Sequence, residues 1–450
     1  MTSSFSGLTN ASGALAAQRY ALEVTGQNIA NAGTPGYTRQ RAELAATGPV
    51  TGVPSLYSIA QASTGVTVSG TSRLDDSVLD VRVRIEHDKN SYAQTSTSQL
   101  SGVESLFNEP SDTGLAEQLG AMWNAWSVVA NNPADGAARS VVLQKSATVA
   151  ATLNTTASAL NDLTQGTSAQ LDQAVVDLNT AAGSLAQINA AMAVAKATGA
   201  SVNSLSDQRD ALLLTLADKA GAQAVLQADG SATVTLGGQP LVTGNVASTV
   251  AVGAGNQLTV GGTPAGTAGG VAQGLVDALT TTIPSFVSQL DAVAASLAST
   301  VNAAHQAGFD LSGAAGTQFF SGTTAATIAV AITDPSKIAA SGVPGGNLDA
   351  STALALSAMG SASGGADSTY KDLIGTLASQ VQRSTQTAAV QAAVTTSVDA
   401  QAQSVGGVSF DEETTNMLTY QRAYQASSRV LTTVDDMLDT LINRTGRAGL

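Results

Sequence analysis

Apolar residues recur every seven positions at the N-terminal end of the chain, and they predict a helix over residues 5–31. Ala11 fills one of the positions midway between them, whereas Gln18 and Thr25 occupy the others. The apolar stripe on this helix is therefore narrow. Its members are Leu8, Leu15, Leu22 and Ile29.

The same seven-residue interval returns at the C-terminal end and predicts a helix over residues 409–443, the clearest in the chain. Ser409 is a good N-cap, and the acidic residues that follow it favour a helix N-terminus through the helix dipole. The seven-residue series is Phe410, Met417, Tyr424, Leu431 and Leu438, and the residues between them are Tyr420, Val434 and Leu441.

Between the two ends, helical spacing dominates residues 76–220, with breaks at Pro110 and Pro133. Helices are also predicted over 271–307, with Pro284 in a first turn, and over 367–402. Within the first stretch the predicted helices are 114–130, 135–165, 167–196 and 203–219.

Residues 221–262 instead alternate between apolar and polar, with turns at Asp229-Gly230 and Gly237-Gly238. This pattern predicts β-hairpins. Further short strands are predicted at 65–70 and within 325–332, the latter inside an otherwise irregular segment.

The fold class that follows is mainly α with a β-rich central domain, in an elongated, rod-like, multi-domain chain. The N- and C-terminal heptad helices pair at one end, a helical-bundle domain comes next, and a β-containing domain is outermost. The predicted domains are residues 1–50 plus 405–450, a terminal coiled-coil domain; 51–220 plus 271–307 plus 366–404, a helical bundle; and 221–270 plus 308–365, a β-rich outer domain.

Charge narrows the possible partners. The formal net charge is −14, and charged residues make up only 12% of the chain, so neither nucleic acid nor an anionic membrane surface is expected to bind. No apolar stretch is long enough to span a membrane, and the first residues lack the pattern of a cleaved signal peptide.

Candidate chemistry is sparse. The chain has no cysteine, and its two histidines, His87 and His305, lie far apart, so neither a metal site nor a cofactor is expected. His305 lies near a helix C-terminus, where a histidine meets the helix dipole favourably. Trp123 and Trp126 lie three residues apart on one helix and are expected to pack in a core.

A charged cluster opens another predicted helix, and its residues are Asp207, Arg209 and Asp210. A salt-bridged helix start explains this cluster better than catalysis does. With no convergent acid, base or nucleophile, the sequence does not predict an enzyme.

The two terminal stripes are the main functional signal. One interpretation is an ordinary helical hairpin within the chain. The other is that the stripes also pack against neighbouring subunits, because a two-helix hairpin buries too little apolar area to be stable alone. The stripe residues are thus candidate assembly-interface residues.

The segment NIANAGTPGYTRQ ends the first helix abruptly. Gly33 is expected to allow a turn, Pro35-Gly36 to redirect the backbone, and Tyr37 to anchor the departing chain by its ring and hydroxyl. The pattern predicts a structural joint rather than a catalytic loop.

This segment, together with SFDEETTNMLTYQRAYQASSRVLTTVDDMLDTLI near the C-terminus, resembles the family of flagellar rod, hook and hook-associated axial proteins. Interior segments such as GLAEQLGAMWNAWSVVANNPADGAARSVVLQ and SLSDQRDALLLTLADKAG narrow the resemblance to members at the hook-filament junction. A hook or distal-rod protein is the alternative. The turn motif carried over from the family is Asn28, Ala30, Asn31, Pro35, Gly36 and Tyr37.

The resemblance implies a non-enzymatic building block of the bacterial flagellum, located outside the cell. It implies export without a cleaved signal through the flagellar type III apparatus, with an export chaperone at the C-terminal helix. It also implies self-association in a ring and contact with the hook protein and a second hook-filament junction protein. The terminal helices would form the inner tube.

Overall fold

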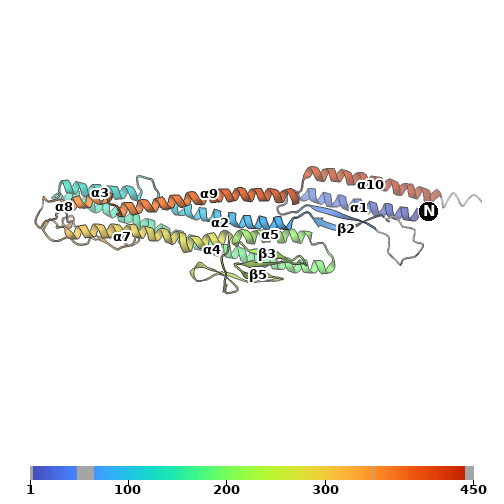
Figure 1. Cartoon of the computed structure of the whole chain (residues 1–450), viewed down its shortest axis with the longest axis horizontal. Helices are drawn as coiled ribbons and strands as arrows, with labels where there is room; N and C mark the ends of the chain where they lie inside the picture. The colour runs from blue at the N-terminus through green and yellow to red at the C-terminus, as the bar shows by residue number, and fades with distance from the viewer. Residues whose placement is uncertain (1–3, 48–64, 347, 441–450) are drawn as a thin grey trace, which may run out of the picture.

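Long helices run side by side along an elongated rod (Figure 1), in a computed structural model that describes residues 4–47, 65–346 and 348–440. The helices are α1 (Ser4–Asn31), α2 (Ser77–Phe107), α3 (Leu115–Asn131), α4 (Gly136–Thr198), α5 (Asn203–Ala220), α6 (Gly270–Asp277), α7 (Ile283–Ala307), α8 (Ser351–Ser357), α9 (Ala366–Gly406) and α10 (Phe410–Asp439). The terminal helices α1 and α10 pair at one end of the rod, as the sequence predicts.

The strands form four small antiparallel sheets rather than one large one. They are β1 (Gln40–Ala46), β2 (Val66–Arg73), β3 (Gln223–Leu226), β4 (Ala232–Leu236), β5 (Gln239–Thr243), β6 (Val246–Ala247), β7 (Val250–Val252), β8 (Leu258–Val260), β9 (Thr263–Pro264), β10 (Phe320–Ser321) and β11 (Ala329–Val330). The first two form a hairpin beside α1, and β3–β6 and β7–β9 form two sheets on the flank of the rod (Figure 1). The chain is therefore mainly α with β-containing parts, as predicted.

Helix α4 is one continuous helix of 63 residues, whereas the sequence suggested two helices separated near Gly166. A glycine inside a helix costs about 1 kcal/mol relative to alanine. Leu160 and Leu171 are buried on either side of Gly166, and their burial outweighs that cost. At 1.5 Å per residue the helix is about 95 Å long, and it contributes buried residues to both apolar cores of the rod.

Two separate apolar cores hold the rod together. The first joins α3 and the early part of α4 to α7, α9 and the segment around Phe319 and Phe320. The second joins the later part of α4 to α5, α6 and strands β4–β8. The segments 221–270 and 308–365, grouped above in one outer domain, thus contribute to different cores.

Both tryptophans lie in the first core, as the sequence predicts. Trp126 is fully buried, with its ring centroid 5.4 Å from that of Phe319. The indole nitrogen Nε1 of Trp123 donates a hydrogen bond of 2.8 Å to Asp367 Oδ2. This hydrogen bond ties α3 to the start of α9.

His305 is fully buried in the last turn of α7, and the interpretation that its charge meets the helix dipole is wrong. The backbone N–H of Ala339 donates to Nε2 at 2.8 Å, so Nδ1 carries the proton and donates to the carbonyl of Thr317 at 2.7 Å. Burial lowers the pKa of His305, and nearby Arg139 lowers it further. The neutral imidazole is a structural cross-link in this core.

The pKa of His305 makes the stability of the rod depend on pH. Its unfolded pKa is about 6.5, and its folded pKa is lower, so protonation favours the unfolded chain. The contribution of neutral His305 to the free energy of unfolding is complete above the unfolded pKa. It is lost as the pH falls below that value, by at most about 1.4 kcal/mol per pH unit. Urea unfolding at pH 7.5 and 5.0, followed by circular dichroism, measures this loss.

His305→Gln is the matched control, because it removes the titrating group and keeps a polar side chain at this position. We expect the variant to be less stable than the natural chain at pH 7.5 but to lose less stability at pH 5.0. An equal loss in both proteins would show that His305 is not the source.

Candidate assembly interface

A tight turn ends α1 and starts the path to the hairpin. The N–H of Tyr37 donates to the carbonyl of Thr34 at 3.2 Å, so Pro35 and Gly36 occupy the two central positions of the turn. Gly36 has a φ of 77°, which the third residue of a type II turn requires and which favours glycine. Gly33 is not in the left-handed region, so the prediction that it supplies the special conformation is wrong.

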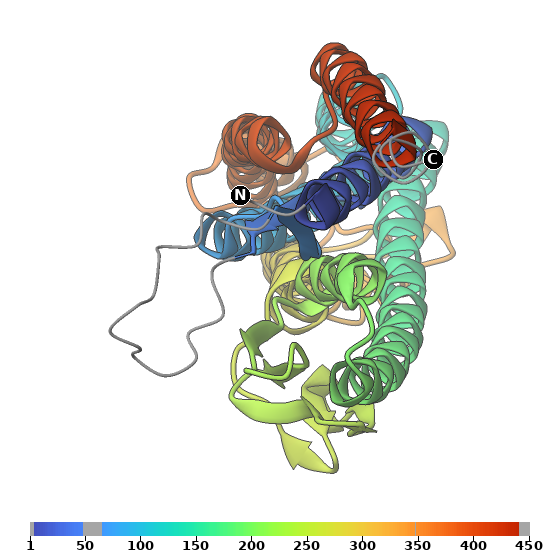
Figure 2. The same ribbon diagram turned by 90° about the vertical axis from the view of Figure 1, so that its right-hand side faces the viewer.

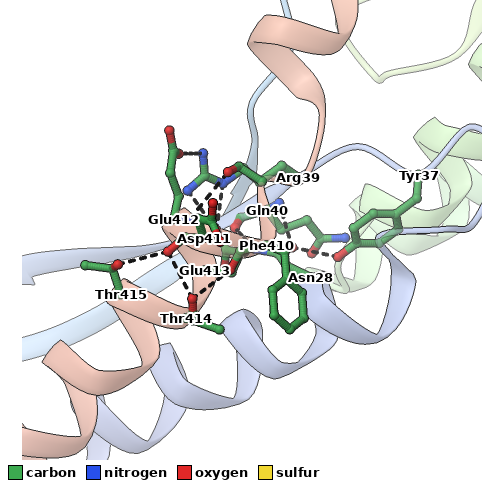
Figure 3. Close-up of polar contacts among 11 residues, drawn as sticks. Asn28, Tyr37, Arg39, Gln40, Phe410, Asp411, Glu412, Glu413, Thr414 and Thr415 are labelled. Carbon is green, nitrogen blue, oxygen red and sulfur yellow. Dashed lines mark hydrogen bonds and ion pairs between the residues drawn. The ribbon is translucent and has the colours of Figure 1, made fainter.

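The turn delivers Tyr37 and Gln40 to a buried asparagine of α1, Asn28, which is 1% exposed. The Oδ1 atom of Asn28 accepts from the Tyr37 hydroxyl at 2.8 Å and from the Gln40 N–H at 3.0 Å. Its Nδ2 donates to the Gln40 carbonyl at 2.8 Å and to Glu413 Oε2 at 3.1 Å. The amide thus makes four hydrogen bonds, the last of them to the opposite end of the chain (Figure 3).

Glu413, in the first turn of α10, is the buried carboxylate of this site, with 2% of its surface exposed. Arg39 donates to its Oε1 through Nε at 2.7 Å and also pairs with Glu412 at 2.5 Å (Figure 3). Burial lowers the pKa of Arg39, but its hydrogen bonds and charge contacts with the two glutamates outweigh this and raise it. Burial, together with Asp207 and Glu413, raises the pKa of Tyr37 to about 12, so its hydroxyl stays a donor.

The backbone around Arg39 fastens the joint to the rod. The N–H of Arg39 donates to the carbonyl of Gly406 at 2.8 Å, and its carbonyl accepts from the N–H of Leu74 at 2.9 Å. Residue 39 therefore bridges the end of α9 and the chain that leads into α2. We call Asn28, Tyr37, Arg39, Gln40 and Glu413 the terminal joint.

A second charged cluster lies next to the terminal joint. Arg73 pairs with Asp207 at 2.9 Å and with Asp210 at 2.8 Å, and Arg209 also pairs with Asp210 at 2.7 Å. The sequence predicted the charged start of α5 as a salt-bridged cluster, but it missed Arg73. The two ion pairs of Arg73 attach the hairpin strand β2 to α5.

A cleft of about 980 Å³ opens between the terminal joint, α2, α5 and α9. Its lining includes the turn from Ala32 to Arg39 and the residues from Ala402 to Ser409. Among the described residues, no group of three or more histidine, aspartate and glutamate side chains is placed to hold a metal ion. The cleft therefore lies where the terminal helix pair meets the helical part of the rod.

Beyond the joint, α1 and α10 run antiparallel, and their apolar stripes stay partly open. The predicted stripe residues Leu8, Leu15, Leu22 and Ile29 are half-buried, whereas the buried face of α1 is Ala11, Ala17, Ala21, Val24, Thr25 and Asn28. Small side chains and one amide thus make the closest packing of α1.

On α10 the predicted stripe residues Met417, Tyr420, Tyr424, Leu431, Val434 and Leu438 are half-buried. Phe410 is 60% exposed, and Leu441 lies outside the described residues. Of the turn motif, Ala30 and Pro35 are exposed, and Asn31 Nδ2 donates to the Gln27 carbonyl at 3.0 Å. An assembly role for the stripes stays a prediction.

Three parts of the chain match known families. Residues 100–320 match the family described as the flagellar hook-associated protein FlgK helical domain. Residues 8–38 match the family described as flagella basal body rod protein, and residues 401–444 match the flagellar basal body rod FlgEFG protein C-terminal family. The two end matches contain Asn28 and Glu413, which the fold brings into contact.

Relatives are similar over the whole length of the chain. Flagellar hook-associated protein 1 of Bacillus subtilis strain 168 is 30% identical over 512 aligned residues, which cover 100% of both chains. The Escherichia coli K12 protein of the same name is 26% identical over 97% of this chain and 99% of its own. The structure of the flagellar hook junction protein FlgK from Burkholderia pseudomallei is similar in fold, with a TM-score of 0.64 and 18% identity, and covers 72% of this chain and 100% of that one.

Because only one of two adjacent glutamates is buried in the terminal joint, we expect their substitutions to destabilise the attachment of α10 by very different amounts. Glu413→Gln removes the buried charge that faces Arg39, and losing such a charged hydrogen bond costs about 1.5–3 kcal/mol. Glu412 is exposed, so Glu412→Gln is expected to cost at most about 1 kcal/mol. Tryptic cleavage of α10 after Arg422 and Arg429 reports the opening of the joint in the purified protein.

We expect cleavage in Glu413→Gln to accelerate by roughly 10- to 100-fold, because about 1.4 kcal/mol corresponds to a factor of ten in an equilibrium constant. Glu412→Gln should stay close to the natural chain. Equal rates for the two variants would mean that the buried carboxylate does not hold α10.

The turn allows a second comparison. Gly36→Val places a branched residue at a φ of 77°, at a cost of roughly 1–3 kcal/mol. Gly33→Ala is the matched control, because Gly33 is exposed and a Cβ there would meet no atom within 4 Å. In a motility assay Gly36→Val should impair swimming while the far-UV spectrum of the purified protein stays near normal, and Gly33→Ala should swim normally. Normal swimming of Gly36→Val would count against the joint.

Proposed function

The chain belongs to the family of flagellar hook-associated protein 1, the structural protein of the hook-filament junction, and we propose that its terminal helices α1 and α10 form the inner layer of that junction. The half-buried stripes of these helices would be completed by neighbouring copies of the chain. The stripe and turn residues named above are the proposed assembly interface.

The single observation that carries this proposal is the terminal joint. Asn28 and Tyr37 come from one end segment that matches a flagellar rod family, and Glu413 comes from the other. Asn28 and Glu413, which are 385 residues apart in sequence, meet there. The joint sets the direction in which the terminal pair leaves the rod. A subunit that must stack regularly with identical copies needs that direction to be fixed.

Membership of the family implies assembly with the hook and other flagellar components. The finer partners that we propose are a ring of copies of the chain, the hook protein below it and a second hook-filament junction protein above it. An export chaperone would bind the C-terminal helix. The abundance of small polar residues and the low content of lysine suit a chain that passes through the type III export apparatus unfolded, without a cleaved signal, to a site outside the cell.

The alternative of a hook or distal-rod protein is less well supported. The matches at the two ends are to families described as flagellar rod proteins, so they do not separate the members of the superfamily. The match of residues 100–320 is to a hook-associated helical domain, and the relatives that match over full length carry the same name. The interior therefore decides between the alternatives.

The family is a structural one, and we propose that the chain has no enzymatic role and no cofactor. Within the described residues, no helix is both long and apolar enough to cross a lipid bilayer. The proposed units are the terminal domain (1–50 plus 405–450) and the helical domain (51–220, 271–307 and 366–404). The segments 221–270 and 308–365, grouped above in one outer domain, are two separate β-containing parts, because they contribute to different cores.

Deletion of the gene tests the proposed place in the flagellum. We expect hooks without filaments in electron micrographs and filament subunits in the culture medium, because filament subunits would have no junction on which to assemble. A plasmid copy of the natural chain should restore filaments, whereas a copy lacking residues 409–450 should not. Normal filaments in the deletion strain would contradict the proposal.

A further inference from the structure

The cleft beside the terminal joint contains a buried arginine of α2. Arg84 lines this cleft and is only 9% exposed. Among the residues that the structure describes, its guanidinium makes neither a hydrogen bond nor an ion pair. A guanidinium carries five N–H donors and a permanent charge, so burial without an acceptor is costly. Burial accordingly lowers the pKa of Arg84, although Asp210 and Asp80 raise it. An acceptor that enters the cleft would remove this cost.

Two other buried arginines show which acceptors this chain provides elsewhere. Arg139, 2% exposed, donates to the carbonyl of Pro133 at 2.8 Å and to that of Ile338. Arg209, 5% exposed, donates to the carbonyl of Gly230 at 2.6 Å. In both cases a neutral peptide carbonyl accepts from the guanidinium. The arginine of the cleft lacks such an acceptor within the described part of the chain.

A carboxylate without a partner lies next to this arginine. Asp80 precedes Arg84 by four residues, so the two share one face of α2, and both line the cleft. Within the described residues the Asp80 carboxylate forms no ion pair and accepts no hydrogen bond. Burial raises the pKa of Asp80, and the charge of Asp210 raises it further. Asp75, which is exposed, also lines the cleft and has no ion pair among these residues.

The cleft as a whole is acidic. Seven carboxylates and three arginines line it, which gives a formal charge of −4 with histidine neutral. The remaining carboxylates already have partners within the chain, either in ion pairs or as a helix cap. These carboxylates are Asp76, Asp207, Asp210, Asp399 and Glu412.

The charges restrict the kind of ligand that fits. An anionic group brought to Arg84 would lie close to Asp80 and Asp210, whose charges repel it. A neutral carbonyl oxygen accepts from the guanidinium without this repulsion. A cationic group is attracted by the net charge of the cleft and can pair with Asp80 or Asp75. The complementary ligand therefore combines a neutral acceptor with a positive charge.

Size and apolar lining favour a peptide. Leu79 and Val83 of α2 and Leu214 of α5 line the cleft and are half-buried, so they offer contacts to aliphatic groups. The volume of about 980 Å³ is at the upper end of the range of about 300–1,000 Å³ for ligand sites. A peptide supplies carbonyl acceptors along its backbone, and a lysine or arginine side chain adds the charge and an aliphatic stem.

We propose that this cleft binds an extended, basic peptide segment of another protein. A backbone carbonyl of the segment accepts from Arg84, and a lysine or arginine side chain of the segment pairs with Asp80. The site lies within one copy of the chain. The inference therefore goes beyond the proposed place in the flagellum and does not depend on it.

A bound segment would bridge two parts of the molecule. The turn from Ala32 to Arg39 lines the cleft together with α2, α5 and the end of α9. Viewed from the terminal end of the rod, α1 and α10 stand in front of these helices (Figure 2). The segment contacts the terminal joint and the rod at once, so binding favours one orientation of the terminal pair.

Titration of the purified protein with synthetic peptides tests the site. The probe is an acetylated and amidated pentapeptide with a central lysine between alanines and leucines at its ends. The control peptide has glutamate in place of lysine. Methyl NMR spectra follow the cleft through the signals of Leu79, Val83 and Leu214. We expect the lysine peptide to shift these signals and to bind at least about tenfold more tightly than the glutamate peptide.

Asp80→Asn should remove most of the preference for lysine over glutamate. Asp372→Asn is the matched control, because Asp372 is an exposed carboxylate of α9 that does not line the cleft. It should leave the preference unchanged. Equal binding of both peptides to the natural chain, or no shift of the cleft signals at millimolar lysine peptide, would overturn the proposal.

A second variant separates a binding role of Arg84 from a structural one. Arg84→Met keeps a long apolar stem and removes the unpaired charge. We expect its urea midpoint to equal or exceed that of the natural chain, while the affinity for the lysine peptide falls several-fold. Arg82→Met is the matched control, because Arg82 is exposed outside the cleft, and it should change neither quantity. A clear fall of the midpoint in Arg84→Met alone would show that Arg84 supports the fold and would contradict the proposal.

Discussion

One buried contact determines how the two ends of the chain are held: the carboxylate of Glu413 between Asn28 and Arg39. A carboxylate that is 2% exposed is tolerable only if its oxygens are paired. Asn28 supplies one donor and is itself fixed by Tyr37 and Gln40, which the turn through Gly36 brings back to α1. The end of α1, the turn and the start of α10 are therefore parts of one hydrogen-bonded unit.

Backbone contacts attach this hydrogen-bonded unit to the rest of the rod. Helix α9 leads into α10 through Gly407–Ser409, while the N–H of Arg39 holds the last residue of α9. Helices α1 and α10 thus both leave the rod at the terminal joint. The bundle behind the joint is stiffened by α4, which is about 95 Å long. The terminal pair itself leaves its stripes half-open, which is the property expected of a surface that neighbouring copies complete.

Periodicity and local turn chemistry were enough to predict the terminal helices, the helical interior and the hairpins, because these depend on neighbours in sequence. Long-range pairs were not predictable. Arg39 and Glu413 are 374 residues apart, and nothing near either residue indicates the other. The same holds for Arg73 with Asp207. The predicted helix break near Gly166 was wrong for another reason. Residues buried on both sides of Gly166 keep α4 continuous and override the weak preference of glycine against a helix.

Hydrogen exchange of the terminal helices, compared between the purified monomer and isolated flagella, tests the central claim most directly. The account predicts that backbone amides of α1 and α10 exchange much faster than those of α4 in the monomer and become protected in the assembled junction. Protection of α1 and α10 in the monomer equal to that of α4 would contradict it, because no neighbouring copy would then be needed to complete the terminal pair.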